Sequence, residues 1–370
     1  MMSSTDRYFP RPDSIYYFWK GRVALYTILQ AFGIGPGDEV ILPGFTCVVV
    51  ANAVLYRGAK PVYADIDPRT YNVSADTIES LITDRTKIIL AQNTFGLSPD
   101  LDPIMELAEE HDIRVIEDCA QGLGGRYRGK PSGTVAPASF FSTQWSKPVS
   151  TGLGGFAYIA DREIARKMEK IQRDLQRPSL MEEGILAAQL LMRPLLRVPF
   201  LYYRLIKLYR YLTRTLGFSV GSSTGQELKT IEMPEGYLKK MGMLQKWVWR
   251  KRFSQLDEMV NKRQVVAKRY DTFFQSIGFD PPYKPEYADH SMLRYTIRVD
   301  HKDEILEKAK RLNVPLGDWF VSPLDPVEGD LSPWGYHEGQ CPNAEKAASE
   351  TVNLIPDQPV TDDQLKALFT

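Results

Sequence analysis

Residues 139–148 read Ser-Phe-Phe-Ser-Thr-Gln-Trp-Ser-Lys-Pro, and residues 151–155 read Thr-Gly-Leu-Gly-Gly. Lys147 therefore follows an apolar strand pattern and precedes a glycine-rich turn. Ser142, five residues before the lysine, carries a hydroxyl group that suits a phosphate ligand. Glycines in the turn allow positive φ angles and a close approach of the backbone to a ligand. A lone lysine beside a glycine pair is usually a surface residue, so other parts of the sequence must support a site.

An acid at the end of a predicted strand provides that support. Residues 115–121 read Val-Ile-Glu-Asp-Cys-Ala-Gln, a short buried strand that ends at Asp118. A lysine, a carboxylate and phosphate-binding groups are the set that pyridoxal 5′-phosphate (PLP) requires. We expect Lys147 to condense with the cofactor aldehyde and carry the proton, and Asp118 to keep the pyridine nitrogen protonated. We expect Ser142 to hold the phosphate.

With these residues the sequence resembles the DegT/StrS-type sugar aminotransferases, which are fold-type I PLP-dependent enzymes. The resemblance also rests on residues 21–25, 35–43 and 58–67 and on the chain from Gln255 to the C-terminus. It covers most of the chain except about residues 175–235. It implies a homodimer with active sites at the subunit interface. It also implies amino transfer from an amino acid such as glutamate to a keto sugar. That sugar is expected to be nucleotide-linked and to serve polysaccharide or glycoconjugate biosynthesis.

The start of a predicted helix is a second candidate for the phosphate site. Apolar residues recur at helical spacing over residues 22–33, and Gly21 precedes them. A helix N-terminus binds anions through its free N–H groups and its dipole. The resemblance places the PLP phosphate at the backbone of Gly21, Arg22 and Val23. The side chain of Arg22 is expected either to contact the phosphate or the substrate, or to be a solvated arginine at the helix start.

Two further cofactor contacts follow from the resemblance. Gln121 matches the residue that contacts the phenolic oxygen of PLP in the family. Cys47 matches the position of an aromatic residue that stacks on the cofactor ring in many relatives. Either the thiol of Cys47 covers the ring, or Phe45 or Trp145 does. A lone cysteine is also often just a small core residue.

Predicted strands alternate with predicted helices through the first half of the chain. This order is typical of an open, mostly parallel sheet that binds ligands at the carboxyl ends of its strands. We therefore expect an α/β fold with an open, mostly parallel sheet, and the resemblance implies the fold-type I class with a seven-stranded type of sheet flanked by helices. Residues 1–240 are expected to form a large PLP-binding domain. Residues 241–370 are expected to form a small α+β domain that opens with one long helix over residues 242–275.

Composition excludes several other classes of function. The 370 residues include 46 basic and 46 acidic side chains, so nothing favours a nucleic-acid partner. Cys47, Cys119 and Cys341 lie far apart, and the four histidines form no ligand pair, so no metal site is expected. The N-terminus shows no signal-peptide pattern, and no uncharged stretch is long enough to span a bilayer. These features predict a cytoplasmic protein.

A basic amphipathic insertion interrupts the α/β pattern at about residues 178–230. No acidic residue lies between Ile185 and Gln226, and arginines and lysines alternate with leucines over residues 193–216. The leucines share one helical stripe, and the basic residues lie mainly on the other side. This composition fits a peripheral helix on the anionic inner face of a membrane. It also fits a helical insertion packed against the sibling subunit.

Two other functions share the central residues. Another PLP-dependent reaction on the same scaffold would also use Lys147, although dehydratase relatives replace this lysine with histidine. The second is a membrane-docked relative that binds PLP or a sugar without turnover. Many relatives carry an asparagine and an arginine that reach into the partner's site, at positions near Met241 and Met243 of this chain, where Lys239 or Lys240 could substitute for them. The changed residues Arg22, Cys47 and Met241 motivate the non-catalytic alternative.

Overall fold

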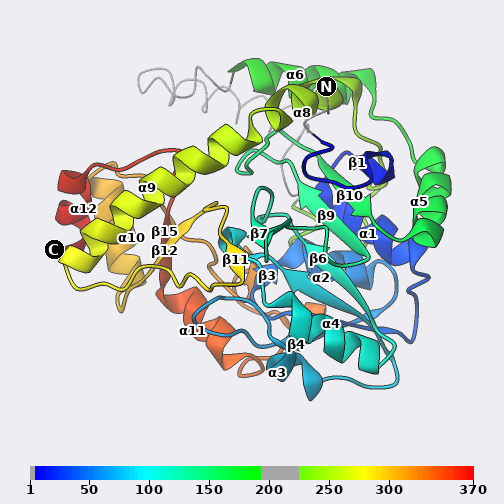
Figure 1. Ribbon diagram of the computed structural model, residues 1–370, viewed down its shortest axis with the longest axis horizontal. Helices are drawn as coiled ribbons and strands as arrows, with labels where there is room; N and C mark the ends of the chain where they lie inside the picture. The colour runs from blue at the N-terminus through cyan, green and yellow to red at the C-terminus, as the bar shows by residue number, and fades with distance from the viewer. Residues whose placement is uncertain (1–4, 193–224) are drawn as a thin grey trace.

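The computed structural model describes residues 5–192 and 225–370. A seven-stranded sheet forms its centre, with strand order β1-β10-β9-β6-β5-β2-β4 (Figure 1). β10 is antiparallel to both of its neighbours, and all other pairs are parallel. The predicted mostly parallel α/β sheet is therefore confirmed. Its strands are β1 (Ile15–Phe18), β2 (Glu39–Pro43), β4 (Lys60–Ala64), β5 (Thr86–Gln92), β6 (Arg114–Asp118), β9 (Ala138–Ser142) and β10 (Gly155–Ile159).

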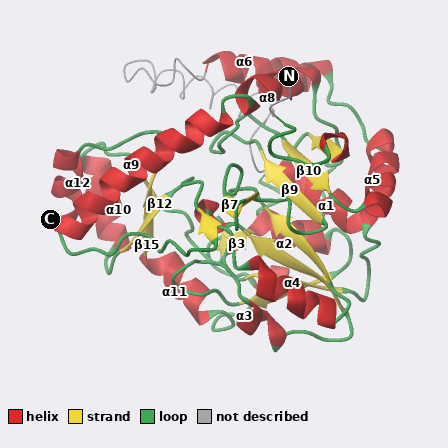
Figure 2. Cartoon of the chain, in the orientation of Figure 1, coloured by secondary structure: helices red, strands yellow, loops and turns green. Residues whose placement is uncertain are grey.

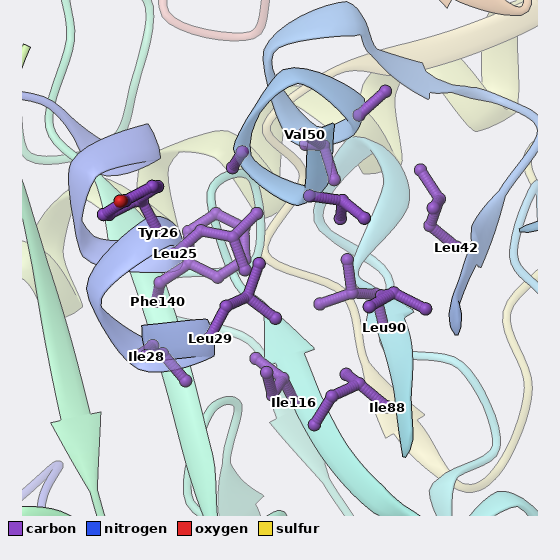
Figure 3. Packing of buried hydrophobic residues seen from close by; sticks show 14 of the residues in the cluster. Leu25, Tyr26, Ile28, Leu29, Leu42, Val50, Ile88, Leu90, Ile116 and Phe140 are labelled. Carbon is purple, nitrogen blue, oxygen red and sulfur yellow. The ribbon is translucent and has the colours of Figure 1, made fainter. Parts of the chain in front are cut away.

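Helices cover both faces of this sheet because its central strands are apolar on both sides. Along β2, Val40 and Leu42 point to one hydrophobic cluster, and Ile41 between them points to another. One face packs against α1 (Gly21–Ala31), α2 (Val48–Leu55) and α5 (Arg162–Asp174), the other against α3 (Ala75–Glu79) and α4 (Leu101–Glu110). Figure 3 shows the first cluster, in which α1 contributes Leu25, Ile28 and Leu29 and the strands contribute Ile88, Leu90, Ile116 and Phe140. Each such buried side chain stabilises the fold by about 1.5–3 kcal/mol.

A smaller sheet lies in the C-terminal part of the chain. It has the order β12-β15-β13 and packs against α9, α10 and α12 around Tyr270, Phe274 and Tyr295 (Figure 2). Its elements are α9 (Leu256–Ser276), β12 (Tyr295–Arg298), α10 (Lys302–Arg311), β13 (Leu316–Gly317), β15 (Thr351–Leu354) and α12 (Asp362–Phe369). The domain limits drawn from the sequence stay a prediction.

Short elements connect the two sheets. The most important connection for the site is a parallel pair in which β14 (Leu324–Asp325) lies beside β3 (Thr46–Cys47). α11 (Pro342–Glu350) packs with its alanines on the first hydrophobic cluster. The remaining elements are η1 (Pro12–Ser14), η2 (Thr94–Gly96), β7 (Arg126–Tyr127), β8 (Lys130–Pro131), α6 (Leu180–Met192), α8 (Met243–Phe253), β11 (Ala288–Asp289) and η4 (Ser332–Trp334).

The single long helix predicted over residues 242–275 is wrong. The chain forms α8 and α9 with a break at Ser254 and Gln255. The hydroxyl of Ser254 donates to the carbonyl oxygen of Lys251, and the N–H of Gln255 donates to the carbonyl oxygen of Arg252. Such bonds to the residue three positions earlier tighten the last turn and bend a helix.

Most of the basic insertion lies outside the described residues. α6 covers its beginning, and the predicted amphipathic stretch 193–216 lies outside the described residues. Among the helices formed by residues 5–192 and 225–370, none is both long and apolar enough to cross a bilayer.

Candidate active site

Most of the predicted site residues meet in one cavity of about 430 Å³. It lies at the carboxyl ends of the parallel strands β6 and β9, where ligands of such sheets bind. The start of α1 and the strand β3 form other parts of the wall, and residues 318–328 close it from the C-terminal part. The predicted residues on the wall are Gly21, Arg22, Cys47, Asp118, Gln121, Ser142 and Lys147. A larger hollow of about 750 Å³ between α1, α5 and residues 233–238 contains none of them.

Val23 differs from the other predicted contacts because it lies in the core. Its side chain is fully buried in the first hydrophobic cluster and is absent from the cavity wall. Its backbone N–H donates to the carbonyl oxygen of Lys20 at 3.2 Å. The contribution of Val23 to a phosphate site stays a prediction, restricted to its backbone.

Lys147 lies in the loop after β9 and extends its side chain into the cavity. The Nζ atom lies 4.8 Å from the centre of the Trp319 ring. The pKa of Lys147 is lowered to about 8, chiefly by burial and then by the positive charge of Arg294. Asp118 and Asp325 act in the opposite direction, because their negative charges favour the ammonium form. A lysine in this state gives up its proton more readily than a surface lysine.

Asp118 ends β6, the strand next to the one that leads to Lys147. Its side chain is buried, and Oδ1 accepts a hydrogen bond from the N–H of Ala120 at 2.9 Å. Burial raises the pKa of Asp118 to about 6, while the bond from Ala120 and the charge of Lys147 lower it in part. A buried carboxylate with so few donors favours a positively charged partner.

The start of α1 lies against the end of β9. A methyl group at Gly21 would come within 3.1 Å of the carbonyl oxygen of Phe141 and 3.2 Å of Ser142 Cβ. A methyl group at Gly155 would come within 2.3 Å of Gly21 Cα, so glycine is required there for the two segments to touch. This close approach brings the helix N-terminus and the hydroxyl of Ser142 to the same wall of the cavity. The pair provides the donors that an anion requires.

Arg22 is not the solvated arginine that one alternative expected. Its side chain is buried, and one guanidinium nitrogen donates to Glu227 Oε1 at 2.6 Å. Lys20 also lies 3.6 Å from Glu227, whose side chain is buried as well. The solvated interpretation is wrong because a carboxylate from about 200 residues further along the chain neutralises the guanidinium. A contact between Arg22 and the cofactor stays a prediction.

Cys47 and Gln121 lie on the wall in positions that suit a ligand. Cys47 directly precedes the first turn of α2, and burial raises the pKa of its thiol. Gln121 Oε1 accepts a hydrogen bond from the N–H of Phe95 at 2.9 Å, so the side-chain amide presents its NH2 end as a donor. Phe45, an alternative cover for the cofactor ring, is fully buried against Phe320 and does not line the cavity. Their roles toward the cofactor stay predictions.

Sequence reasoning missed the acidic groups that residues 318–328 bring to the cavity. Trp319 and Phe320 supply aromatic surface to the cavity, and Asp318, Asp325 and Glu328 supply acidic groups. No apolar run marks this acid in the sequence, because Asp325 stands between Leu324 and Pro326. Its pairing with β3 joins segments almost 280 residues apart, which no local pattern shows.

The residues present fit PLP. The cavity combines a lysine with a lowered pKa, a buried carboxylate that accepts a backbone hydrogen bond, and phosphate donors at a helix N-terminus. Within the described part of the chain, no cluster of three histidine, cysteine or acidic side chains is arranged to hold a metal ion.

Comparison with known proteins points to the same chemistry. The chain matches the DegT/DnrJ/EryC1/StrS aminotransferase family over residues 19–183 and 206–369. The UDP-2-acetamido-2-deoxy-3-oxo-D-glucuronate aminotransferase of Pseudomonas aeruginosa is 31% identical over 348 residues, which cover 92% of this chain and 80% of that protein. The GDP-perosamine synthase of Caulobacter vibrioides is 46% identical over 152 residues, or 41% of either chain.

Solved structures agree on the fold. A DegT/DnrJ/EryC1/StrS aminotransferase from Brucella abortus superimposes with a TM-score of 0.71 at 22% identity. The superposition covers 96% of this chain and 84% of that one. The similarity therefore includes both the central sheet and the C-terminal sheet.

Proposed function

Since the chain belongs to the DegT/DnrJ/EryC1/StrS aminotransferase family, we propose that it transfers an amino group from an amino acid, with glutamate as the expected donor, to a nucleotide-linked keto sugar. It is a PLP-dependent aminotransferase. The observation that carries the proposal is that Lys147 and Asp118 share one cavity with the phosphate donors at the start of α1. The names of the Pseudomonas and Caulobacter relatives support a sugar linked to UDP or GDP as the acceptor.

Each site residue has a separate role in the proposed reaction. PLP, when bound, supplies an electron sink that carries the amino group from donor to acceptor. Nζ of Lys147 would hold the cofactor and later accept and release the proton that moves during transfer. The Asp118 carboxylate would stabilise a positive charge on the ring nitrogen. Ser142 and the backbone at Gly21 would hold the phosphate, and the NH2 group of Gln121 would orient the ring.

The proposed function is tested by a product assay. The enzyme with PLP and glutamate is incubated with UDP- and GDP-linked keto sugars, and aminated products are sought by mass spectrometry. The proposal expects an aminated nucleotide sugar together with 2-oxoglutarate. Bleaching of the cofactor by glutamate without any aminated sugar would favour another PLP reaction. If neither step occurs, the non-catalytic alternative gains support.

We also propose that the protein is a homodimer that uses the outer surface of α6 and α8. These helices lie side by side (Figure 1), joined by a hydrogen bond from the N–H of Met243 to Glu183 Oε1. Met243 and Trp247 are one helical turn apart on α8 and are 79% and 62% exposed. Leu191 on α6 is 77% exposed. Large apolar side chains gathered on a surface favour a protein interface.

The dimer proposal predicts a mass near twice the 42.1 kDa of one chain in sedimentation equilibrium. Trp247→Glu should shift the protein toward the monomer, because a charge would be buried in the interface. Leu312→Glu provides a control, since this exposed apolar residue follows α10 in the C-terminal part. A Trp247→Glu variant that keeps the wild-type mass would contradict this interface.

Peripheral membrane contact through residues 193–216 remains a proposal that rests on the sequence, because this stretch lies outside the described residues. It would place a cytoplasmic enzyme at the inner face of the membrane. We expect the protein to float with liposomes that contain anionic lipid, and deletion of residues 185–226 to reduce that flotation strongly in low salt. Equal flotation of both proteins would contradict the proposal.

A further inference from the structure

A second carboxylate faces the cavity from the C-terminal part of the chain. β14 pairs in parallel with β3, so that Asp325 lies directly opposite Cys47. The side chain of Asp325 is 7% exposed and lines the cavity together with Lys147. Oδ1 accepts a hydrogen bond from the N–H of Val321 at 3.1 Å. A strand ladder and a hydrogen bond therefore fix this acid on the wall.

Other nearby cations are occupied by different partners. Lys302 is buried, and its Nζ donates to the carbonyl oxygens of Asp318, Phe320 and Ala348. Arg22 is ion-paired with Glu227. These contacts leave Lys147 as the cation in the described cavity wall that is available to Asp325.

Charges from several elements act on Lys147. Arg294, next to β12, lies with its guanidinium 4.3 Å from the Trp319 ring centre and disfavours the ammonium form of Lys147. Asp118 on β6 and Asp325 on β14 favour it. Burial and the neighbouring Asp318 raise the pKa of Asp325 to about 6, against the bond from Val321 and the charges of Lys147 and Lys302. Asp325 is therefore largely ionised at neutral pH.

We propose that Asp325 is a further positioning residue of the proposed reaction, and that its carboxylate stabilises the protonated Nζ of Lys147. Nζ must accept and release a proton, and a nearby carboxylate lowers the free energy of the protonated lysine. In the proposed function Asp118 interacts with the ring nitrogen of the cofactor. A second acid is therefore needed to stabilise the protonated Nζ of Lys147. The β3–β14 pair thereby connects the C-terminal part of the chain to the proton carrier.

The test follows the protonation of Lys147 directly. Cofactor-free, full-length protein is labelled with trace acetic anhydride from pH 6 to pH 10, and acetylation of Nζ is measured by mass spectrometry. With Asp325→Asn we expect about a three-fold faster labelling of Lys147 at pH 7, because loss of the carboxylate favours the free amine. Asp102→Asn is a control that removes an acidic charge on α4, away from the cavity, and should label at the wild-type rate.

Two further measurements separate a charge effect from damage to the fold. Asp325→Glu keeps the charge and should keep the wild-type labelling rate. In the PLP-loaded enzyme, Asp325→Asn should shift the pH profile of kcat/KM for glutamate, which a purely structural role would not move. Unchanged labelling of Lys147 in Asp325→Asn would overturn the proposal. Since labelling requires no sugar, a failure to find a keto-sugar substrate would overturn the proposed function alone.

Discussion

Replacing Lys147 by alanine should abolish amino transfer, with a loss of at least about 10³-fold in kcat/KM, because one side chain both holds the cofactor and carries the proton. The variant should fold normally, since Nζ extends into a cavity and not into the core. Activity is followed by the formation of 2-oxoglutarate from glutamate, and folding by circular dichroism.

Lys147→Arg separates charge from reactivity. Arginine keeps the positive charge but cannot condense with an aldehyde, so this variant should be as inactive as Lys147→Ala. Lys167→Ala on α5 is a control for loss of an exposed lysine and should retain full activity. Substantial turnover by either Lys147 variant would contradict the assignment.

Replacing Asp118 by asparagine should have the second largest effect, a loss of about 10²-fold or more in kcat/KM. The buried carboxylate would no longer stabilise a positively charged ring nitrogen. The measurement is the same kinetic assay at saturating PLP. Glu117→Gln is unsuitable as a control, because Glu117 accepts three backbone N–H groups from the loop at residues 133–136. Asp102→Asn, an exposed acid in α4, is preferable.

The same substitution should stabilise the cofactor-free protein. Burial raises the pKa of Asp118 to about 6 in the folded chain, above the ordinary value of 3.8. The charged form is therefore disfavoured in the fold, and this penalty grows as the pH rises from about 4 to about 6 and stays constant above. Asp118→Asn should raise the free energy of unfolding at pH 7 by up to about 2–3 kcal/mol. If Asp118→Asn is no more thermally stable than the wild type at pH 7, the raised pKa of Asp118 is contradicted.

Acid should also weaken PLP binding. As the pH falls below about 6, Asp118 in the free protein takes up a proton and loses the charge that attracts the ring nitrogen. PLP affinity should therefore decline on the acid side of pH 6 in the wild type, and this decline should be less steep in Asp118→Asn, where only the protonation of Lys147 still opposes binding. Fluorescence titrations with PLP at several pH values measure it.

The site residues that could be predicted from the sequence are those marked by local patterns. Ser142 and Lys147 flank one strand end, and Asp118 ends the neighbouring parallel strand. Because parallel strands end at the same edge of the sheet, their proximity followed from the strand pattern alone. The mostly parallel sheet followed from the same alternation.

The parts that were missed depend on contacts between distant segments. Arg22 is buried because Glu227 reaches it, and Asp325 joins the cavity because β14 pairs with β3. The break between α8 and α9 depends on a hydroxyl of Ser254 that bonds to the backbone, against a continuous apolar pattern. Helical periodicity shows none of these interactions.

The most direct test of the central claim is a visible absorbance spectrum of the purified protein with PLP, recorded with and without glutamate, beside Lys147→Ala. We expect a band of lysine-bound cofactor in the wild type, its bleaching by glutamate, and its absence in Lys147→Ala. A band that appears unchanged in Lys147→Ala, or no band in the wild type after PLP is added, would contradict the assignment of Lys147 and its cavity as the active site.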